Sequence, residues 1–147
     1  MENSNDLKTM RILFRAVQSL EQIIKKDVKN YGFTMNEFAA VEALYHKGRL
    51  SVNEITQAVL IPNSSMTYVL DRLEVKGLIC RLQDTDDKRT FYVELSKLGL
   101  DKLNDILPKH YKVLTNVFGI LTTEEQALLN DSLKKLGYYA KALEETT

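Results

Sequence analysis

The segment from Ser51 to Leu95 constrains this chain most, because two short helical patterns in it are followed by two alternating ones. Ser51 and Glu54 have the spacing of a capping box, in which each side chain accepts a hydrogen bond from a backbone N–H at the start of a helix. The helix that follows is expected to bury Val52, Ile55 and Val59. After a turn near 60–61, Pro62 suits the first turn of a second helix, where its missing N–H is harmless. The segment therefore begins as a helix-turn-helix.

The second helix has one apolar stripe and ends at Gly77, a residue that favours a helix C-terminal cap. The stripe follows the i, i+3, i+4, i+7 spacing and consists of Met66, Val69, Leu70 and Leu73. Two alternating stretches, 78–82 and 91–95, then surround the charged tip Asp84-Thr85-Asp86-Asp87-Lys88-Arg89 and predict a hairpin. Its inner face is expected to carry Leu78, Cys80 and Leu82. This order predicts a winged helix-turn-helix, which places its second helix in the major groove of DNA and its hairpin along neighbouring phosphates.

Long helical patterns flank this module on both sides. The first runs from Leu7 to about Lys29, with apolar residues at Leu7, Met10, Phe14, Val17, Leu20 and Ile24. A capping box of Thr34 and Glu37 opens a helix that ends near Gly48. After the hairpin, helical spacing resumes from Ser96 to Phe118, with an expected bend at Pro108, and a capping box of Thr122 and Glu125 opens the last helix.

These flanking helices carry more apolar surface than a small winged helix covers, which predicts that part of it is buried against a second copy of the chain. We therefore expect one mainly α-helical domain over 1–147 with a small β-hairpin wing. Within it, 34–95 form the winged helix-turn-helix, and 1–31 and 97–147 form dimerisation helices.

Composition limits the other options. At 147 residues, 44% of them hydrophobic, the chain suits one domain with its own core. Its 20 basic and 20 acidic residues cancel, so DNA binding must depend on local placement of charge. Cys80, the single cysteine, forms no internal disulfide, and the polar residues 1–6 do not resemble a signal peptide, so we expect a cytoplasmic protein. No apolar run approaches the ~20 residues of a membrane span.

The polar residues of the second helix are the candidates for reading DNA. Ser65, Thr67 and Tyr68 lie on its outward arc and could contact base edges, or be an ordinary solvated face. Asn63 and Ser64, at the start of the helix, are expected to bond phosphates together with free backbone N–H groups.

The basic residues of the module have two alternative roles. Arg72, Lys76 and Arg81 are candidates for phosphate contacts, but Arg72 or Lys76 could equally form a surface ion pair with Asp71 or Glu74. Lys88, at the wing tip, is expected to reach the minor groove or its phosphates. Arg89 either joins it there or ties back to Asp84 or Asp87 and stiffens the hairpin.

Other chemistry-bearing residues favour ordinary structural roles. Cys80 could be a redox sensor, but its expected inward position favours a buried, inert side chain. His46, His110 and Cys80 lie on separate elements without ligand spacing, so no metal site is expected. Four aromatic residues could line a ligand pocket or simply belong to the core: Tyr31, Phe38, Tyr45 and Tyr111.

Three stretches together resemble the MarR family of bacterial regulators, named for multiple antibiotic resistance, and the likeness covers nearly the whole chain. Residues 64–79, SSMTYVLDRLEVKGLI, resemble its recognition helix, 84–89 its wing tip, and 95–99, LSKLG, the junction after the wing. The wing departs from the family at Asp86, where arginine is frequent. More narrowly, residues 42–48 and 65–69 resemble the branch that responds to quinones and catechols.

The resemblance implies a homodimer whose two recognition helices enter successive major grooves of an inverted-repeat operator. It implies a repressor that a phenolic or quinone-like compound, or an oxidant, releases from DNA. We expect no cofactor. The alternative is a winged helix that binds proteins and has no operator, which zero net charge and Asp86 favour but the small polar face of the second helix opposes. An enzyme finds no support, because the chain has no phosphate-binding glycine loop, nucleophile motif or metal-ligand spacing.

Overall fold

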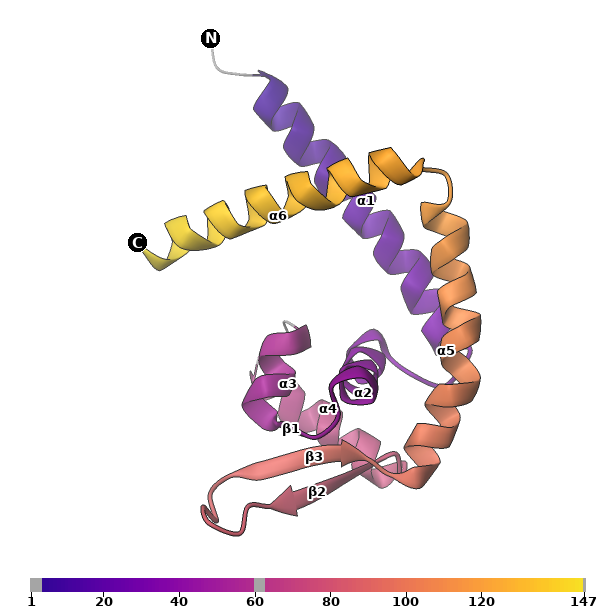
Figure 1. Cartoon of the computed structure of the whole chain (residues 1–147), viewed down its shortest axis with the longest axis vertical. Helices are drawn as coiled ribbons and strands as arrows, with labels where there is room; N and C mark the ends of the chain where they lie inside the picture. Colours follow the sequence, from indigo (N-terminus) through magenta and orange to yellow (C-terminus); the bar gives the residue numbers. More distant parts are fainter. Residues whose placement is uncertain (1–3, 60–62, 147) are drawn as a thin grey trace. The chain divides into compact units, whose positions relative to one another are not determined.

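The computed structural model describes residues 4–59 and 63–146, and the side chains of 63 and 64 lie outside that description. The chain forms two compact units, 1–110 and 111–147, each of which is described by itself. The elements, shown in Figure 1, are α1 (Ser4–Lys29), α2 (Met35–Lys47), β1 (Leu50–Ser51), α3 (Val52–Val59), α4 (Asn63–Val75), β2 (Ile79–Gln83), β3 (Phe91–Leu95), α5 (Lys97–Phe118) and α6 (Thr123–Glu145). The mainly α-helical fold with a small wing is thus confirmed. The position of Pro62 lies outside the described residues.

The helices begin where capping chemistry predicts. At α2, the Glu37 backbone N–H donates to Thr34 Oγ1 at 3.1 Å, and the Thr34 N–H donates to Glu37 Oε1 at 2.9 Å. The same reciprocal bonds occur at α3 between Ser51 and Glu54 and at α6 between Thr122 and Glu125. All three predicted capping boxes are therefore confirmed.

The core of the first unit is formed by α2, α3, α4 and the sheet, together with Val28 of α1 and three residues of α5, Leu103, Ile106 and Leu107. The predicted stripe of α4 is buried, and the central residue of α3, Ile55, is fully buried with it. Val52 and Val59, the other two residues expected inside, are only partly buried. Helix α4 ends at Gly77, whose φ of 75° is the left-handed conformation that glycine adopts without strain.

The wing is a three-stranded antiparallel sheet of order β1-β3-β2, where the sequence predicted two strands. Leu50 and Ser51 of β1 pair with Val93 and Tyr92, but two residues are too short to show an alternating pattern. The predicted facing of β2 was wrong. Ile79 pairs with Leu95 and is buried, whereas Cys80 pairs with Glu94 and is exposed.

The error has a physical reason. Leu78 is buried, but it belongs to the turn after α4, where its backbone N–H donates to Leu73 O at 3.0 Å. The strand starts one residue later, at Ile79, and a shift of one residue exchanges the two faces of a strand. The expectation that Cys80 points inward, based on counting from Leu78, therefore fails.

A buried polar group joins α1 to α5 in the first unit. His110 Nδ1 lies 2.8 Å from Asp27 Oδ2, and both side chains are less than a tenth exposed. Tyr31 donates its hydroxyl to the other oxygen of Asp27 at 3.3 Å, and the His110 ring lies 4.7 Å from that of Phe38. Burial first, and then the negative Asp27, raises the pKa of Tyr31 above its ordinary value. This group fixes the C-terminal end of α1 to α5.

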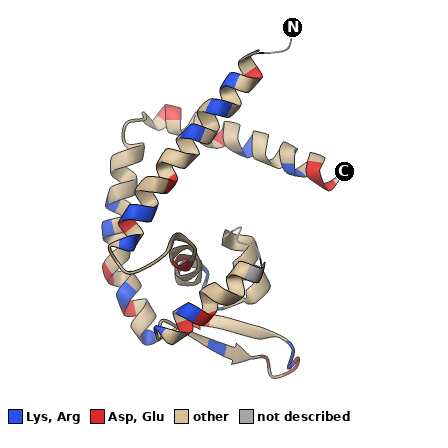
Figure 2. Cartoon of the chain, turned by 180° about the vertical axis from the view of Figure 1, so that it is seen from behind, with Lys and Arg blue, Asp and Glu red and all other residues tan. Residues whose placement is uncertain are grey.

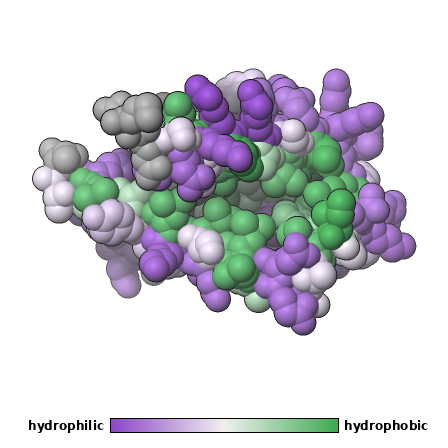
Figure 3. Space-filling view, turned by 90° about the horizontal axis from the view of Figure 1, so that it is seen from above, coloured by the Kyte–Doolittle hydropathy of each residue, from purple (hydrophilic) through white to green (hydrophobic). Residues whose placement is uncertain are grey.

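Both units expose apolar side chains, which are visible in green in the view of Figure 3. On α1 the exposed set with helical spacing is Leu7, Met10, Phe14 and Val17. On α6, in the second unit, it is Leu129, Leu133, Leu136 and Leu143. In the described part of the chain, no helix is both long and apolar enough to cross a membrane.

We expect Gly99→Ala to destabilise the first unit. A Cβ at position 99 would overlap the carbonyl oxygen of Leu78, a backbone atom that cannot rotate away. The cost should be about 1–3 kcal/mol, as in overpacked cores. The measurement is the free energy of unfolding from urea titrations followed by circular dichroism.

Gly137→Ala is the matched control, because position 137 lies inside α6 and a Cβ added there would meet no atom within 4 Å. It should stabilise the helix by up to about 1 kcal/mol. Equal effects of the two substitutions would contradict the steric explanation.

Candidate nucleic-acid interface

Helix α4 has one face in the core and one in solvent. Its buried stripe fixes the rotation of the helix, so that Thr67, Tyr68 and Arg72 are exposed. Tyr68 is 66% exposed, a large fraction for an aromatic side chain in a helix centre. The outward arc predicted from the sequence is therefore the exposed arc, and Ser65 lies at its half-buried edge.

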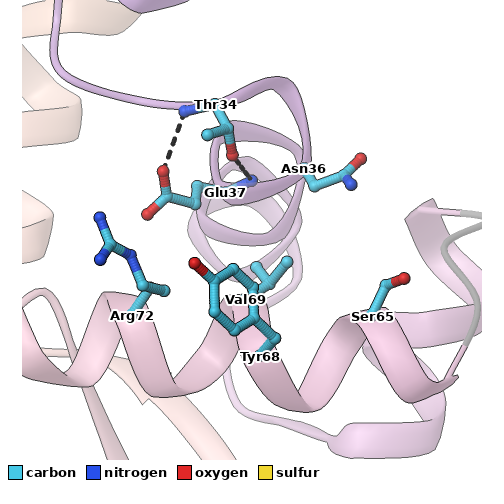
Figure 4. Close-up of a pocket in the computed structure, with 7 residues that line it drawn as sticks. All are labelled: Thr34, Asn36, Glu37, Ser65, Tyr68, Val69 and Arg72. Atoms are coloured by element: carbon cyan, nitrogen blue, oxygen red, sulfur yellow. Dashed lines mark hydrogen bonds between the residues drawn. The ribbon is translucent and has the colours of Figure 1, made fainter.

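A hollow of about 450 Å³ lies between the exposed face of α4 and the start of α2. Its lining, shown in Figure 4, is Thr34, Asn36, Glu37, Ser65, Tyr68, Val69 and Arg72. Tyr68 and Arg72 project from α4 toward the capping box of α2 in this view. The surface that carries the candidate reading residues is thus continuous with the first turn of α2.

Lys76 has a different environment from the exposed residues of α4. Its Nζ donates to Glu37 Oε2 and to the carbonyl oxygen of Gly32, both at 2.9 Å. Burial by itself would raise the pKa of Glu37, but the hydrogen bonds from Lys76 and from the Thr34 backbone outweigh it and hold the pKa below its ordinary value. From the sequence, Asp71 and Glu74 were the candidate partners of Lys76. The observed partner is Glu37, which is 39 residues away along the chain.

Arg81 of β2 pairs with Asp71 and Glu74, the two carboxylates that were the candidate partners of Arg72 or Lys76. Its Nη2 lies 2.6 Å from Asp71 Oδ1, and its Nε lies 3.7 Å from Glu74 Oε2. Both carboxylates belong to α4, so these contacts tie the wing to α4. The guanidinium is already engaged within the protein.

The wing tip is organised by Asp87. Its Oδ1 accepts from the backbone N–H of Arg89 at 3.0 Å and from Arg89 Nε at 3.2 Å, and its Oδ2 accepts from the Thr90 hydroxyl at 3.2 Å. These bonds, the one from the Arg89 backbone first, lower the pKa of Asp87. Of the two alternatives for Arg89, the structure shows the contact with an aspartate of the tip, Asp87, and a contact of Arg89 with DNA stays a prediction.

Lys88 is exposed beside this anchored turn, and its backbone carbonyl accepts from Gln83 Nε2 at 2.6 Å. Between Asp71 and Arg89 there are five basic residues. In the described part of this segment, only Arg72 and Lys88 have no acidic partner among these ion pairs. Figure 2 shows the mixture of basic and acidic residues at the tip.

The remaining candidates are placed as follows. Asn63 and Ser64 lie in the first turn of α4, but their side chains fall outside the described structure, so their phosphate contacts stay a prediction. A redox role for the exposed Cys80 also stays a prediction. Among the described residues, no group of three or more His, Cys, Asp or Glu could hold a metal ion.

The four aromatic residues considered for a ligand pocket have separate environments. Phe38 is buried in the core, and Tyr31 bonds Asp27. Tyr45 donates its hydroxyl to Asn104 Oδ1 at 2.7 Å. Tyr111 belongs to the second unit. Their role as a pocket stays a prediction.

We expect the stability conferred by Glu37 to decline in acid. Its folded-state pKa is lowered, so the unfolded chain binds the proton more readily and stability falls as pH falls below the ordinary value of 4.5. Glu37→Gln keeps an acceptor for Thr34 but not the charge, and should cost about 1–3 kcal/mol at pH 7. Urea titrations from pH 7 to about pH 3 should show the wild-type and variant stabilities converging.

Glu125→Gln is the control, because it alters a capping box on an exposed helix start. The difference in free energy of unfolding between Glu125→Gln and wild type should change less with pH than the difference for Glu37→Gln. Parallel curves for wild type and Glu37→Gln would contradict the assignment.

The sequence matches a known protein family. The sequence profile of the MarR family matches residues 33–91. The HTH-type transcriptional regulator MhqR of Bacillus subtilis (strain 168) is 34% identical over 135 residues, which are 92% of this chain and 93% of MhqR.

Two solved structures share the fold. Sco3205, a MarR family transcriptional regulator from Streptomyces coelicolor in complex with DNA, matches with a TM-score of 0.87 and 22% identity over 93% of this chain and 88% of that one. BpsR of Bordetella bronchiseptica, whose DNA binding is regulated by 6-hydroxynicotinic acid, matches with a TM-score of 0.80 and 23% identity over 88% of this chain and 98% of that one. With a relative at 34% identity over nearly the whole of both chains, this protein belongs to the MarR family of DNA-binding transcriptional regulators.

Proposed function

We propose that this protein is a ligand-responsive repressor that binds an inverted-repeat operator as a homodimer. The observation that carries the proposal is the surface formed by α4 and the wing. It presents the exposed Tyr68 and Arg72 together with Lys88, while neighbouring basic residues are neutralised within the protein.

The residues of this surface divide into two roles. Thr67 and Tyr68, on the exposed centre of α4, contact base edges, with Ser65 beside them. Arg72 and Lys88 contact phosphates or the minor groove, and contribute affinity without sequence information. Asn63 and Ser64 bond phosphates at the start of the helix. Because only two of the five basic residues are free of carboxylates, affinity for random DNA should be modest.

A second copy of the chain supplies the other reading head. The apolar residues with helical spacing on α1 and on α6 are exposed in the single chain, although burying them is favourable by about 25 cal/mol per Å². We assign 1–31 and 97–147 to this dimer interface and 34–95 to the reading head, within one functional domain. The two-fold symmetry of such a dimer requires an inverted repeat in the DNA.

The controlling ligand is proposed to be a hydroxylated aromatic compound. This proposal is supported by the resemblance of residues 42–48 and 65–69 to the quinone-responsive branch, and by the similarity of fold to BpsR, which 6-hydroxynicotinic acid regulates. The ligand would favour a dimer in which the spacing of the two heads no longer matches the operator.

Selection of bound sequences from random duplex DNA at near-physiological salt tests the proposal. We expect an inverted repeat whose half-site centres lie about one helical turn apart. Titration of the complex with a quinone, a catechol and salicylate should then identify a compound that releases the DNA. Failure to enrich any sequence would favour the alternative of a protein-binding winged helix.

Substitutions at the surface should separate the two roles. Lys88→Ala should weaken binding to all sequences and reduce the slope of log affinity against log salt by about 1 for each head, because one phosphate contact is lost. Tyr68→Ala or Thr67→Ala should instead change the preferred bases, with about 1–3 kcal/mol of discrimination lost at the contacted position. Fluorescence anisotropy on operator and random duplexes measures both effects, and equal losses on both for all three variants would contradict the division.

A further inference from the structure

Lys76 makes three contacts with the connection between α1 and α2 and with the first turn of α2. It lies one residue beyond the end of α4, and its Nζ donates at 2.9 Å to both Gly32 O and Glu37 Oε2. The same Nζ lies 5.7 Å from the centroid of the Phe33 ring, within range of a cation–π interaction. The base of the recognition helix is thus fastened to a segment more than 35 residues earlier in the sequence.

The carboxylate that holds Lys76 is itself fixed. Glu37 Oε1 accepts from the Thr34 backbone N–H at 2.9 Å, and its Oε2 accepts from Lys76. Its side chain is 4% exposed, so neither oxygen can turn to solvent without losing a bond. Because both oxygens are engaged, the position of Lys76 is defined relative to the first turn of α2.

Arg72, one turn earlier on α4, provides the contrast. It is exposed, lines the hollow between α2 and α4, and has no carboxylate partner in the described chain. A cation that is already neutralised by a buried carboxylate displaces few counterions from DNA, whereas an unpaired one displaces about one for each phosphate it meets. The two residues are therefore distinguishable by experiment, although both were candidates for phosphate contacts.

We propose that Lys76, through Glu37, is a positioning residue that sets the angle of the recognition helix on α2 and does not contact DNA. The proposal rests on the DNA-binding function proposed above. It means that α4 is held at two places outside its core stripe: to α2 by Lys76 and to the wing by Arg81. Loss of the contact between Lys76 and Glu37 would let α4 tilt while leaving its exposed side chains unchanged.

The test compares wild type with Lys76→Met, Glu37→Gln and the double variant. Operator affinity is measured by fluorescence anisotropy over a series of salt concentrations, at a temperature where urea titrations show each protein to be folded. Each single variant should bind about tenfold more weakly at every salt concentration, and the double variant no more weakly than either, because one interaction is removed in all three. The slope of log affinity against log salt should stay at the wild-type value.

Arg72→Met is the reference, because loss of a phosphate contact should lower that slope by about 1 for each head. If Lys76→Met lowers the slope in the same way, or if Glu37→Gln increases affinity by freeing Lys76 for a phosphate, the proposal is overturned. Lower stability with unchanged operator affinity also overturns it, because the pair would then be merely structural. Where Lys76→Met does not fold, Lys76→Gln keeps a donor for Gly32 and is judged by the same slope.

Wild-type protein separates this proposal from the one on which it rests. If wild type selects no duplex sequence, the proposed function fails. If wild type binds its operator, the variants decide the role of Lys76 alone.

Discussion

Burial of one stripe of α4 is the interaction on which the rest of the site depends. Met66, Leu70 and Leu73 are essentially inaccessible to solvent, and Val69 is nearly so. Turning the helix to expose them would cost roughly 1.5–3 kcal/mol for each side chain, so the rotation of α4 is fixed. Tyr68 and Arg72 are exposed because they occupy the opposite arc, and neither needs a specific bond to stay there. The packing of the core therefore also selects the face of α4 that stays exposed, which is the face we propose for contact with DNA.

Ion pairs within the protein engage most of the basic residues between Asp71 and Arg89. The carboxylates of α4 are directed to Arg81, the buried Glu37 to Lys76, and Asp87 of the wing tip to Arg89. Each pair also joins two parts of the head or stiffens its hairpin. Among these ion pairs of the described residues, Arg72 and Lys88 are left without an acidic partner, and Asp84 and Asp86 are left without a basic one. For the DNA-binding function proposed above, such an arrangement should limit binding to random DNA and make recognition depend on geometry more than on total charge.

The flanking helices α1 and α6 differ from α4 because they expose apolar side chains with helical spacing. The end of α1 is fixed to α5 by the buried group of Asp27, Tyr31 and His110. Farther along α1, and along α6, apolar side chains are exposed. A helix with one face apolar over several turns gains stability mainly by packing that face. The exposed apolar faces of the flanking helices therefore support the dimer proposed above.

The sequence by itself determined the parts of the protein that depend on neighbours along the chain. Capping boxes start α2, α3 and α6 because their bonds span only three residues, and the stripe of α4 follows from the period of the helix. Tertiary structure decided the rest. The two-residue β1 carries no periodic signal, the facing of Cys80 depends on where the turn after α4 ends, and Lys76 found its partner in Glu37, beyond the reach of local pairing rules. These features were not predictable because strand register and ion pairs between distant segments are set by which surfaces the core brings together.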